Sequence, residues 1–94
     1  MRYIDVHWIH DFEDEPVRLL SEIGPDNFEI RKLEFFRNGI VGYASNREEH
    51  GGTKLGIVEV PCIDEINLQS EFQGVEINKV KFELLWQKNV PTSS

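Results

Sequence analysis

An alternation of apolar and polar side chains through the first half of the chain is the feature that most limits its fold. Ile4, Val6 and Trp8 occupy one parity of residues 3–10, and polar side chains lie between them. Successive side chains of a β-strand point to opposite faces of a sheet, so this period of two predicts a half-buried strand. The first element of the chain is therefore expected to be a strand of a β-sheet.

Turn signals divide the following residues into further strands. Gly24-Pro25-Asp26-Asn27 separates an expected strand at 17–23 from a third strand that begins at Phe28. Within the third strand the apolar parity changes at Arg31-Lys32, which predicts a β-bulge. Asn38-Gly39 then predicts a hairpin with a type I′ turn, because that turn needs positive φ at both central residues.

The middle of the chain is polar and rich in glycine. Residues 45–53 predict a mobile surface loop, and residues 55–60 predict a short strand that Pro61 ends. Gly51-Gly52-Thr53-Lys54 could present backbone N–H groups to an anion, but the full phosphate-loop pattern is missing. A plain loop is the favoured interpretation.

Two helices are expected after Pro61. Ile63 and Ile66, extended to Leu68, have the spacing of a short amphipathic helix, and Gly74 is expected to end that segment before a short extended piece at 75–77. Asn78 is a suitable N-cap for a last helix, whose apolar stripe is Phe82, Leu85 and Trp86. The prediction is an α+β fold with a mostly antiparallel meander of four to five strands, covered on one face by two C-terminal helices.

Length and composition predict a single domain. Its 94 residues, 39% of them hydrophobic, suffice for one core, so residues 1–90 are expected to form one α+β domain and residues 91–94 a frayed polar tail. Cys62 is the only cysteine, which excludes an intramolecular disulfide and favours a buried or half-buried structural thiol. The N-terminus lacks the apolar core of a signal peptide, and no stretch approaches the roughly 20 apolar residues of a membrane-spanning helix. A cytoplasmic location is expected.

The net charge of -7 disfavours nucleic acid and anionic membranes as main partners and favours a basic protein. Such a charge also serves solubility alone. Four carboxylates surround Phe12 within residues 11–15, a mixture that could dock on a basic protein, form a solvated loop or bind a hard cation, although the calcium-loop spacing is missing. The residues expected to bind a partner are Asp11, Phe12, Glu13, Asp14, Glu15, Glu22 and Glu29.

A second candidate surface surrounds His10. With Asp11 beside it, His10 could act as a general base, although the same residues make an ordinary polar face. The candidate ligand face consists of Trp8, His10, Arg31 and Tyr43. His7 and His10 are three positions apart on an expected strand and point to opposite faces, so no metal site is expected. No catalytic motif is present, and neither catalytic residues nor a cofactor are assigned.

The segment from Trp8 to Pro16, WIHDFEDEP, resembles the opening of a family of small bacterial domains of unknown function, in which tryptophan-x-histidine precedes an acidic stretch and a proline. Further segments fit the same pattern: Ser21-Glu22-Ile23, Glu29 to Lys32, Gly39 to Ala44, Thr53 to Gly56, Glu65-Ile66-Asn67 and Phe82 to Trp86. The resemblance covers nearly the whole chain and implies a fold without implying an activity. The chain departs from the family at Cys62, where a helix-capping serine is expected.

In size, acidity and lack of catalytic apparatus the chain is also similar to the immunity proteins that neutralise toxin domains in bacterial competition. This similarity implies an inhibitor that occludes a basic nuclease by mimicking phosphates. The alternatives are a small-ligand module or small enzyme in which Arg31 steers an anionic substrate, and a purely structural subunit. The sequence leaves enzymatic activity open and favours a non-enzyme that is a monomer or a weak homodimer through an exposed edge strand.

Overall fold

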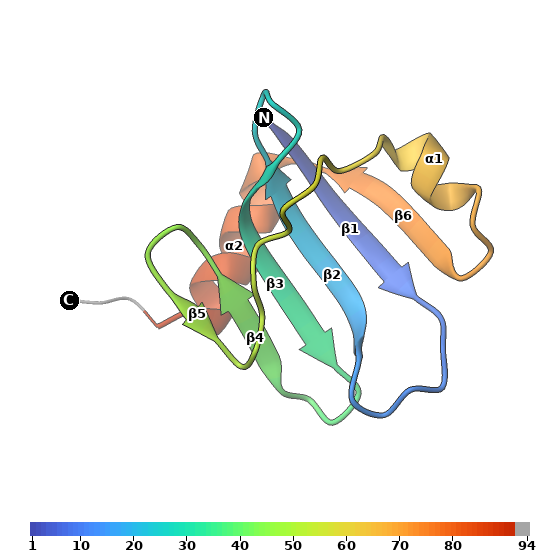
Figure 1. Cartoon of the computed structure of the whole chain (residues 1–94). Helices are drawn as coiled ribbons and strands as arrows, with labels where there is room; N and C mark the ends of the chain where they lie inside the picture. The colour runs from blue at the N-terminus through green and yellow to red at the C-terminus, as the bar shows by residue number, and fades with distance from the viewer. Residues whose placement is uncertain (92–94) are drawn as a thin grey trace.

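The computed structural model describes residues 1–91, and its fold is α+β (Figure 1). One antiparallel sheet of six strands has the order β5-β4-β3-β2-β1-β6. The strands are β1 (Arg2–Trp8), β2 (Pro16–Ile23), β3 (Glu29–Phe36), β4 (Val41–Ala44), β5 (Glu49–His50) and β6 (Phe72–Ile77), and the helices are α1 (Ile63–Asn67) and α2 (Lys79–Asn89). The α+β class is confirmed, and the expected number of strands, four to five, is too low. Fraying was expected for residues 91–94, of which residues 92–94 lie outside the described part of the chain.

Strand β6 is longer than the short extended piece that was expected at 75–77. Gly74 was expected to end a helical segment, but it lies inside β6 and faces Val6 of β1. A Cβ atom at Gly74 would lie 2.7 Å from Cδ1 of Ile63, so glycine is needed there because α1 packs against the strand. The pairing with β6 makes β1 an interior strand of the sheet.

The stretch before α1 also differs from expectation. Residues 45–53 contain the short strand β5, which pairs with β4, and residues 55–60 form no strand. This segment instead crosses one face of the sheet (Figure 1). The N–H of Val60 donates to the carbonyl of Asn27 (2.8 Å), and Arg2 donates to the carbonyl of Val60 (3.2 Å). The crossing chain is thus attached to the sheet by single hydrogen bonds instead of a ladder.

The hairpin between β3 and β4 is confirmed, and the predicted type I′ turn is wrong. Gly39 has a φ of +90°, while Asn38 does not have a positive φ. The N–H of Gly39 donates to the carbonyl of Phe36 (3.0 Å), and the N–H of Phe36 donates to the carbonyl of Ile40 (2.9 Å). These bonds describe a three-residue loop in which a type I turn is followed by a left-handed glycine.

The predicted bulge in the third strand is present one residue earlier than expected. Glu22 faces Arg31 across the ladder, but Ile23 faces Glu29, so Ile30 is the extra residue of β3. A second register shift leaves Val17 unpaired in β2. The shift at Ile30 places Glu29, in place of Ile30, opposite Ile23.

The two helices cover opposite faces of the sheet, which corrects the expectation that both cover one face. Helix α2 lies behind the sheet in Figure 1, and its predicted stripe of Phe82, Leu85 and Trp86 packs on Tyr3, Leu20, Leu33 and Tyr43. Helix α1 packs Ile63 and Ile66 on Ile4, Val6 and Ile23. Neighbouring residues of β1 serve opposite cores because strand side chains alternate. We call the two sides the α2 face and the α1 face.

The predictions for the helix ends are confirmed for α2 and partly wrong for α1. The predicted N-cap Asn78 is confirmed, since its side chain accepts a hydrogen bond from the N–H of Lys81 (2.8 Å). Leu68 is 84% exposed and lies outside α1. Cys62 occupies the N-cap position of α1 without a side-chain capping bond and is exposed, so the expectation of a buried thiol is wrong. Neither helix within residues 1–91 has the length and apolar character needed to cross a membrane.

Candidate functional site

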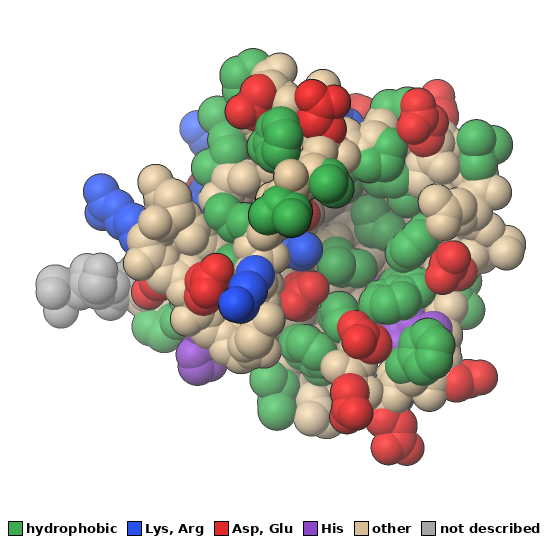
Figure 2. Space-filling view, viewed as in Figure 1, with side chains coloured by type: hydrophobic (Ala, Val, Ile, Leu, Met, Phe, Trp, Pro, Cys, Tyr) green, Lys and Arg blue, Asp and Glu red, His purple; other side chains and the backbone are tan. Residues whose placement is uncertain are grey.

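The connection between β1 and β2, residues 9–15, is called the acidic loop here. Its four carboxylates are exposed, and Phe12 is 63% exposed although it is aromatic. In Figure 2 acidic side chains gather beside a histidine at the lower right, where Figure 1 shows this connection. The structure therefore brings the predicted residues Asp11, Phe12, Glu13, Asp14 and Glu15 together on one projecting surface.

His10 holds the backbone of the acidic loop from both sides. Its Nδ1 accepts a hydrogen bond from the N–H of Phe12 (3.0 Å), and its Nε2 donates to the carbonyl of Pro16 (2.8 Å). The two bonds fit the tautomer of the ring that carries its proton on Nε2. Since both nitrogens are engaged by backbone, the ring orders the loop and offers no free base in this conformation.

Aromatic contacts connect the loop to the sheet. The ring centroids of Trp8 and His10 lie 4.3 Å apart, and those of His10 and Phe12 lie 5.4 Å apart in a stacked arrangement. Trp8 also contacts Phe72 of β6, with centroids 6.0 Å apart, and its Nε1 donates to Glu71 (3.1 Å). The exposed ring of Phe12 thus rests on a chain of rings anchored in the fold.

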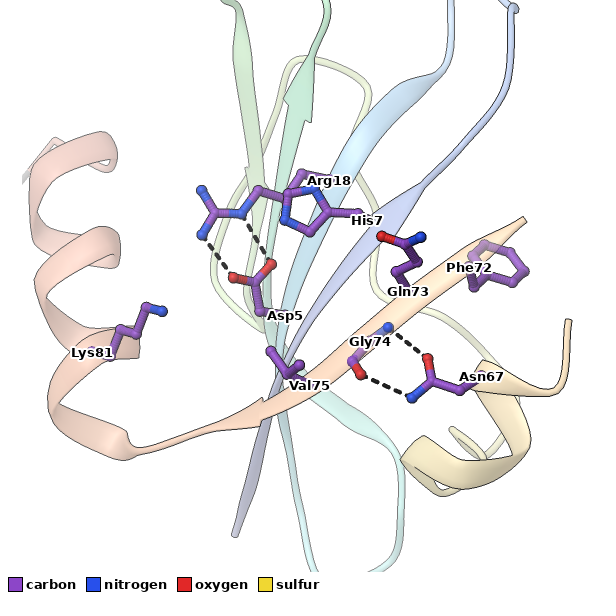
Figure 3. Close-up of a pocket in the computed structure, with 9 residues that line it drawn as sticks. All are labelled: Asp5, His7, Arg18, Asn67, Phe72, Gln73, Gly74, Val75 and Lys81. Atoms are coloured by element: carbon purple, nitrogen blue, oxygen red, sulfur yellow. Dashed lines mark hydrogen bonds and ion pairs between the residues drawn. The ribbon is translucent and has the colours of Figure 1, made fainter. Parts of the chain in front are cut away.

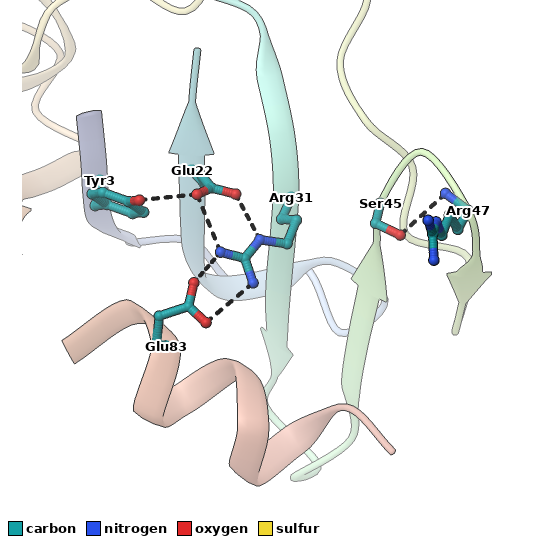
Figure 4. A network of polar contacts seen from close by, with 6 residues as sticks. All are labelled: Tyr3, Glu22, Arg31, Ser45, Arg47 and Glu83. Atoms are coloured by element: carbon teal, nitrogen blue, oxygen red, sulfur yellow. Dashed lines mark hydrogen bonds and ion pairs between the residues drawn. The ribbon is translucent and has the colours of Figure 1, made fainter. Parts of the chain in front are cut away.

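Glu22 and Arg31 lie elsewhere, beneath helix α2 (Figure 4). Arg31 donates to Glu22 from Nε (2.6 Å) and Nη2 (3.1 Å), and it also bonds Glu83 of α2. Its guanidinium lies over the rings of Phe82 and Trp86, 5.0 Å from each centroid. The Tyr3 hydroxyl donates to Glu22 as well (2.9 Å). Glu22 is 6% exposed and fully engaged, so it cannot belong to a docking surface.

This network shifts the titration of its members. The hydrogen bond from Arg31 lowers the pKa of Glu22 below its ordinary value, against the opposing effect of burial. Burial alone would lower the pKa of Arg31, but its hydrogen bonds to Glu22 and Glu83 raise it above the ordinary value. Burial, followed by the bond to Glu22, raises the pKa of Tyr3. Glu22 and Arg31 are therefore charged at neutral pH, and the bonds from Arg31 to Glu22 and Glu83 attach α2 to the sheet.

The other two predicted residues are also engaged inside the fold. Glu29 lies on the α1 face, where it accepts bonds from Ser21 (3.0 Å) and from the N–H of Gly56 (2.6 Å). Tyr43 is 8% exposed and packs against Trp86 and His50. The structure brings Trp8 and His10 together and places Arg31 and Tyr43 beneath α2. The four residues do not form one face.

A groove that the sequence reading did not anticipate lies on the α2 face, beside the helix (Figure 3). It has a volume of about 640 Å³, and its lining includes Asp5, His7, Arg18, Gln73, Val75 and Lys81. Arg18 donates to Asp5 from Nε (2.9 Å) and Nη2 (2.7 Å), and Asp5 is 4% exposed. The hydrogen bond to Asp5 raises the pKa of Arg18. In the sequence, Asp5 and Arg18 appear only as polar residues at strand positions that alternate with apolar ones.

A smaller hollow of about 250 Å³ lies on the α1 face and is visible in the centre of Figure 2. Apolar side chains of Ile4, Val6, Leu19, Ile66 and Phe72 form most of its lining. Phe72 also contacts Trp8, which supports the acidic loop. The hollow and the loop are therefore neighbouring parts of one surface.

The sequence profile of the family DUF6881, described as a domain of unknown function, matches residues 2–91. The chain belongs to this family. The DUF6881 match spans every strand and helix from β1 to α2, and it confirms the resemblance to a family of small domains of unknown function. Searches of curated proteins and of solved structures find no significant match. None of these comparisons links the DUF6881 domain to immunity proteins.

Three surface features of this DUF6881 domain are accessible to another molecule. No group of three or more metal-ligating side chains comes together within residues 1–91. The arrangement instead offers an ordered acidic loop with an exposed aromatic ring, an apolar hollow next to it, and a separate groove that contains an arginine and a lysine.

Proposed function

We propose that this DUF6881 domain binds a basic protein through the acidic loop, with Phe12 as its central anchor. The observation that carries the proposal is the double backbone attachment of His10, which holds the loop while Phe12 and four carboxylates project into solvent. A loop that is ordered before binding loses less conformational entropy on association than a mobile one. An exposed aromatic ring surrounded by charge has the anatomy of an interface hot spot.

The neighbouring hollow supports the same partner class. A basic segment that places arginine or lysine side chains against Asp14 and Glu15 can insert an apolar side chain between Val6, Leu19 and Phe72. Bidentate pairing makes arginine the better match to exposed carboxylates. The partner class is therefore a basic surface that also carries an apolar side chain.

The most specific form of this proposal is an inhibitor of a basic nuclease toxin, in which the loop carboxylates take the positions of nucleic-acid phosphates. Fewer residues carry this form of the proposal than were predicted from the sequence. Glu22 and Glu29 are engaged by internal partners and are left out, whereas Asp11, Glu13, Asp14 and Glu15 remain available.

The test is affinity capture from the native host with wild-type protein and the double variant Asp14→Lys, Glu15→Lys, followed by titration of the purified partner. A matched control, Glu48→Lys with Glu49→Lys, changes the same charge at two exposed positions, Glu48 just before β5 and Glu49 within it. We expect the loop variant to weaken binding about tenfold or more and the control to bind nearly as wild type. Phe12→Ala should weaken binding without changing its salt dependence.

Three outcomes decide the proposal. Loss of a basic partner from the loop variants alone supports the acidic loop. Equal binding by the loop variant and the control contradicts it. A captured partner that is acidic would also contradict it, because the charges would then repel. Inhibition of a captured nuclease by wild type, and not by the loop variant, tests the specific form.

A further inference from the structure

Two arginines on the α2 face use the same edge of their guanidinium groups. Arg31 donates from Nε and Nη2 to Glu22, and Arg18 donates from Nε and Nη2 to Asp5. In both cases the acceptor comes from a neighbouring strand. Each arginine therefore keeps a second edge, formed by Nη1 and Nη2, that can bond two more oxygens in one plane.

That second edge is used differently by the two arginines. In Arg31, Nη1 and Nη2 both bond the carboxylate of Glu83 on helix α2. In Arg18, Nη1 has no hydrogen-bond partner among residues 1–91, and the residue lines the groove of Figure 3. The fold itself thus shows which group suits this edge: a second carboxylate.

The guanidinium of Arg18 is held in a fixed position. Two bonds to the nearly buried Asp5 fix one edge, and the group lies over the ring of Phe35 at 5.1 Å from the centroid. Its side chain is 28% exposed, so the remaining edge stays accessible. A donor fixed in this way needs little reorganisation to bind an anion.

Other donors line the same groove. The strand register places Gln73, His7 and Arg18 side by side across β6, β1 and β2. Lys81 extends from α2 toward the same groove in Figure 3, and it forms no ion pair with any described residue. Since Asp5 balances one positive charge, the groove keeps one more in a protein whose net charge is -7.

We propose that the groove binds a small organic anion whose carboxylate, or other planar pair of anionic oxygens, meets the Nη1–Nη2 edge of Arg18. Lys81 supplies the second charge, and Gln73 and His7 supply further hydrogen bonds. Val75, which is 56% exposed, offers an apolar surface to the body of the molecule. A volume of about 640 Å³ accommodates a molecule larger than an inorganic ion.

A purely structural ion pair explains less of the geometry. It accounts for the burial of Asp5 and for its two hydrogen bonds. It does not account for an accessible arginine edge, an unpaired lysine and two polar strand residues around one hollow. The proposal is independent of the acidic loop, which lies outside this groove.

The test is titration of ¹⁵N-labelled protein with benzoate, with phenyl phosphate and with uncharged benzamide, followed by NMR. We expect both anions to shift the amide signals of Gln73 and Val75 and the Nε–H signal of Arg18, and benzamide to leave them unchanged. A preference for benzoate assigns a carboxylate ligand, and a preference for phenyl phosphate assigns a phosphate ester. Lys81→Gln should weaken binding about tenfold, as loss of one charge-assisted bond does.

The matched control is Lys88→Gln, which removes the same charge from the same helix at its last turn. It should bind as wild type. Arg18→Lys keeps the charge but lacks the planar edge, and it should also lose about tenfold. Absence of shifts at about 10 mM probe, ten times a weak dissociation constant of about 1 mM, would overturn the proposal. Equal losses in Lys81→Gln and Lys88→Gln would overturn it as well, because binding would then follow net charge alone.

Discussion

The side-chain amide of Asn67 makes two hydrogen bonds with the backbone of Gly74. Its oxygen accepts from the Gly74 N–H (2.6 Å), and its nitrogen donates to the Gly74 carbonyl (2.9 Å). The amide thus reproduces the bonds of a neighbouring strand at one position of the outer edge of β6. It blocks part of an edge that would otherwise accept a strand from another molecule.

Replacing Asn67 tests how much this edge contact contributes. We expect Asn67→Ala to lower the free energy of unfolding by about 1 to 2 kcal/mol, because two hydrogen bonds are lost. Urea denaturation measures the change. Asn46→Ala, at an exposed position without a side-chain hydrogen bond to the described residues, should change stability by less than about 0.5 kcal/mol. A similar loss in both variants would show that the amide contributes nothing specific.

Replacement by alanine should lower the stability of the protein by different amounts at two glycines. At Gly42 a Cβ atom would overlap Oγ1 of Thr53, which donates to Glu34 (2.7 Å). We expect a loss of about 3 kcal/mol from this overlap. At Gly39 a Cβ atom would meet nothing within 4 Å, so only the φ of +90° opposes it, at about 1 kcal/mol. Thermal unfolding should rank the variants in that order, and the reverse order would place the strain in the hairpin.

The shifted pKa of Glu22 predicts a specific pH dependence of stability. Arg31 holds that pKa below its ordinary value of 4.5, so the contribution of Glu22 is present above pH 4.5 and is lost as pH falls through the lowered pKa. We expect Glu22→Gln to be less stable than wild type near neutral pH and to lose less stability on acidification. Urea unfolding between about pH 6 and pH 3 measures both curves. Parallel curves would contradict the role given to Glu22.

The order of the acidic loop should depend on His10 alone among the histidines. We expect His10→Ala to speed hydrogen exchange of the Phe12 amide about tenfold, because that N–H loses its acceptor. His7→Ala, at an exposed position, is the control and should leave this amide unchanged. Unchanged exchange in His10→Ala would remove the observation that carries the proposed function.

Local sequence signals predicted the first four strands and the last helix. The hairpin around Gly39 and the cap at Asn78 depend on residues adjacent in the chain, and both were found where expected. The turn type was missed because Asn-Gly fits more than one loop, and the choice depends on which residues pair at its ends.

Long-range contacts account for the errors in the fold. In the sequence Gly74 looks like the end of a helix. In the structure glycine is needed there because Ile63 of α1 lies too close for a Cβ atom. No local pattern reveals that β6 pairs with β1, or that a helix covers each face of the sheet so that both Tyr3 and Ile4 are buried. These facts appear only when distant segments meet.

In the candidate site, too, local features were predicted and long-range contacts were not. The acidic loop was predicted because its carboxylates are contiguous. The internal partners of Glu22 and Glu29 were not, and neither was the groove around Arg18, because the pairing of Arg18 with Asp5 depends on the packing of β1 against β2. A sequence lists charges, but it does not show which of them neutralise one another.

The position of β1 between β2 and β6 has a consequence during synthesis. Its hydrogen bonds to β2 can form early, but those to β6 must wait until residues 72–77 have left the ribosome. Until then the nascent chain carries an open strand edge next to Ile4 and Val6, where pairing with another unfinished copy is a hazard. The bond from Trp8 to Glu71 also forms late, so the support of the acidic loop is completed only when β6 joins the sheet.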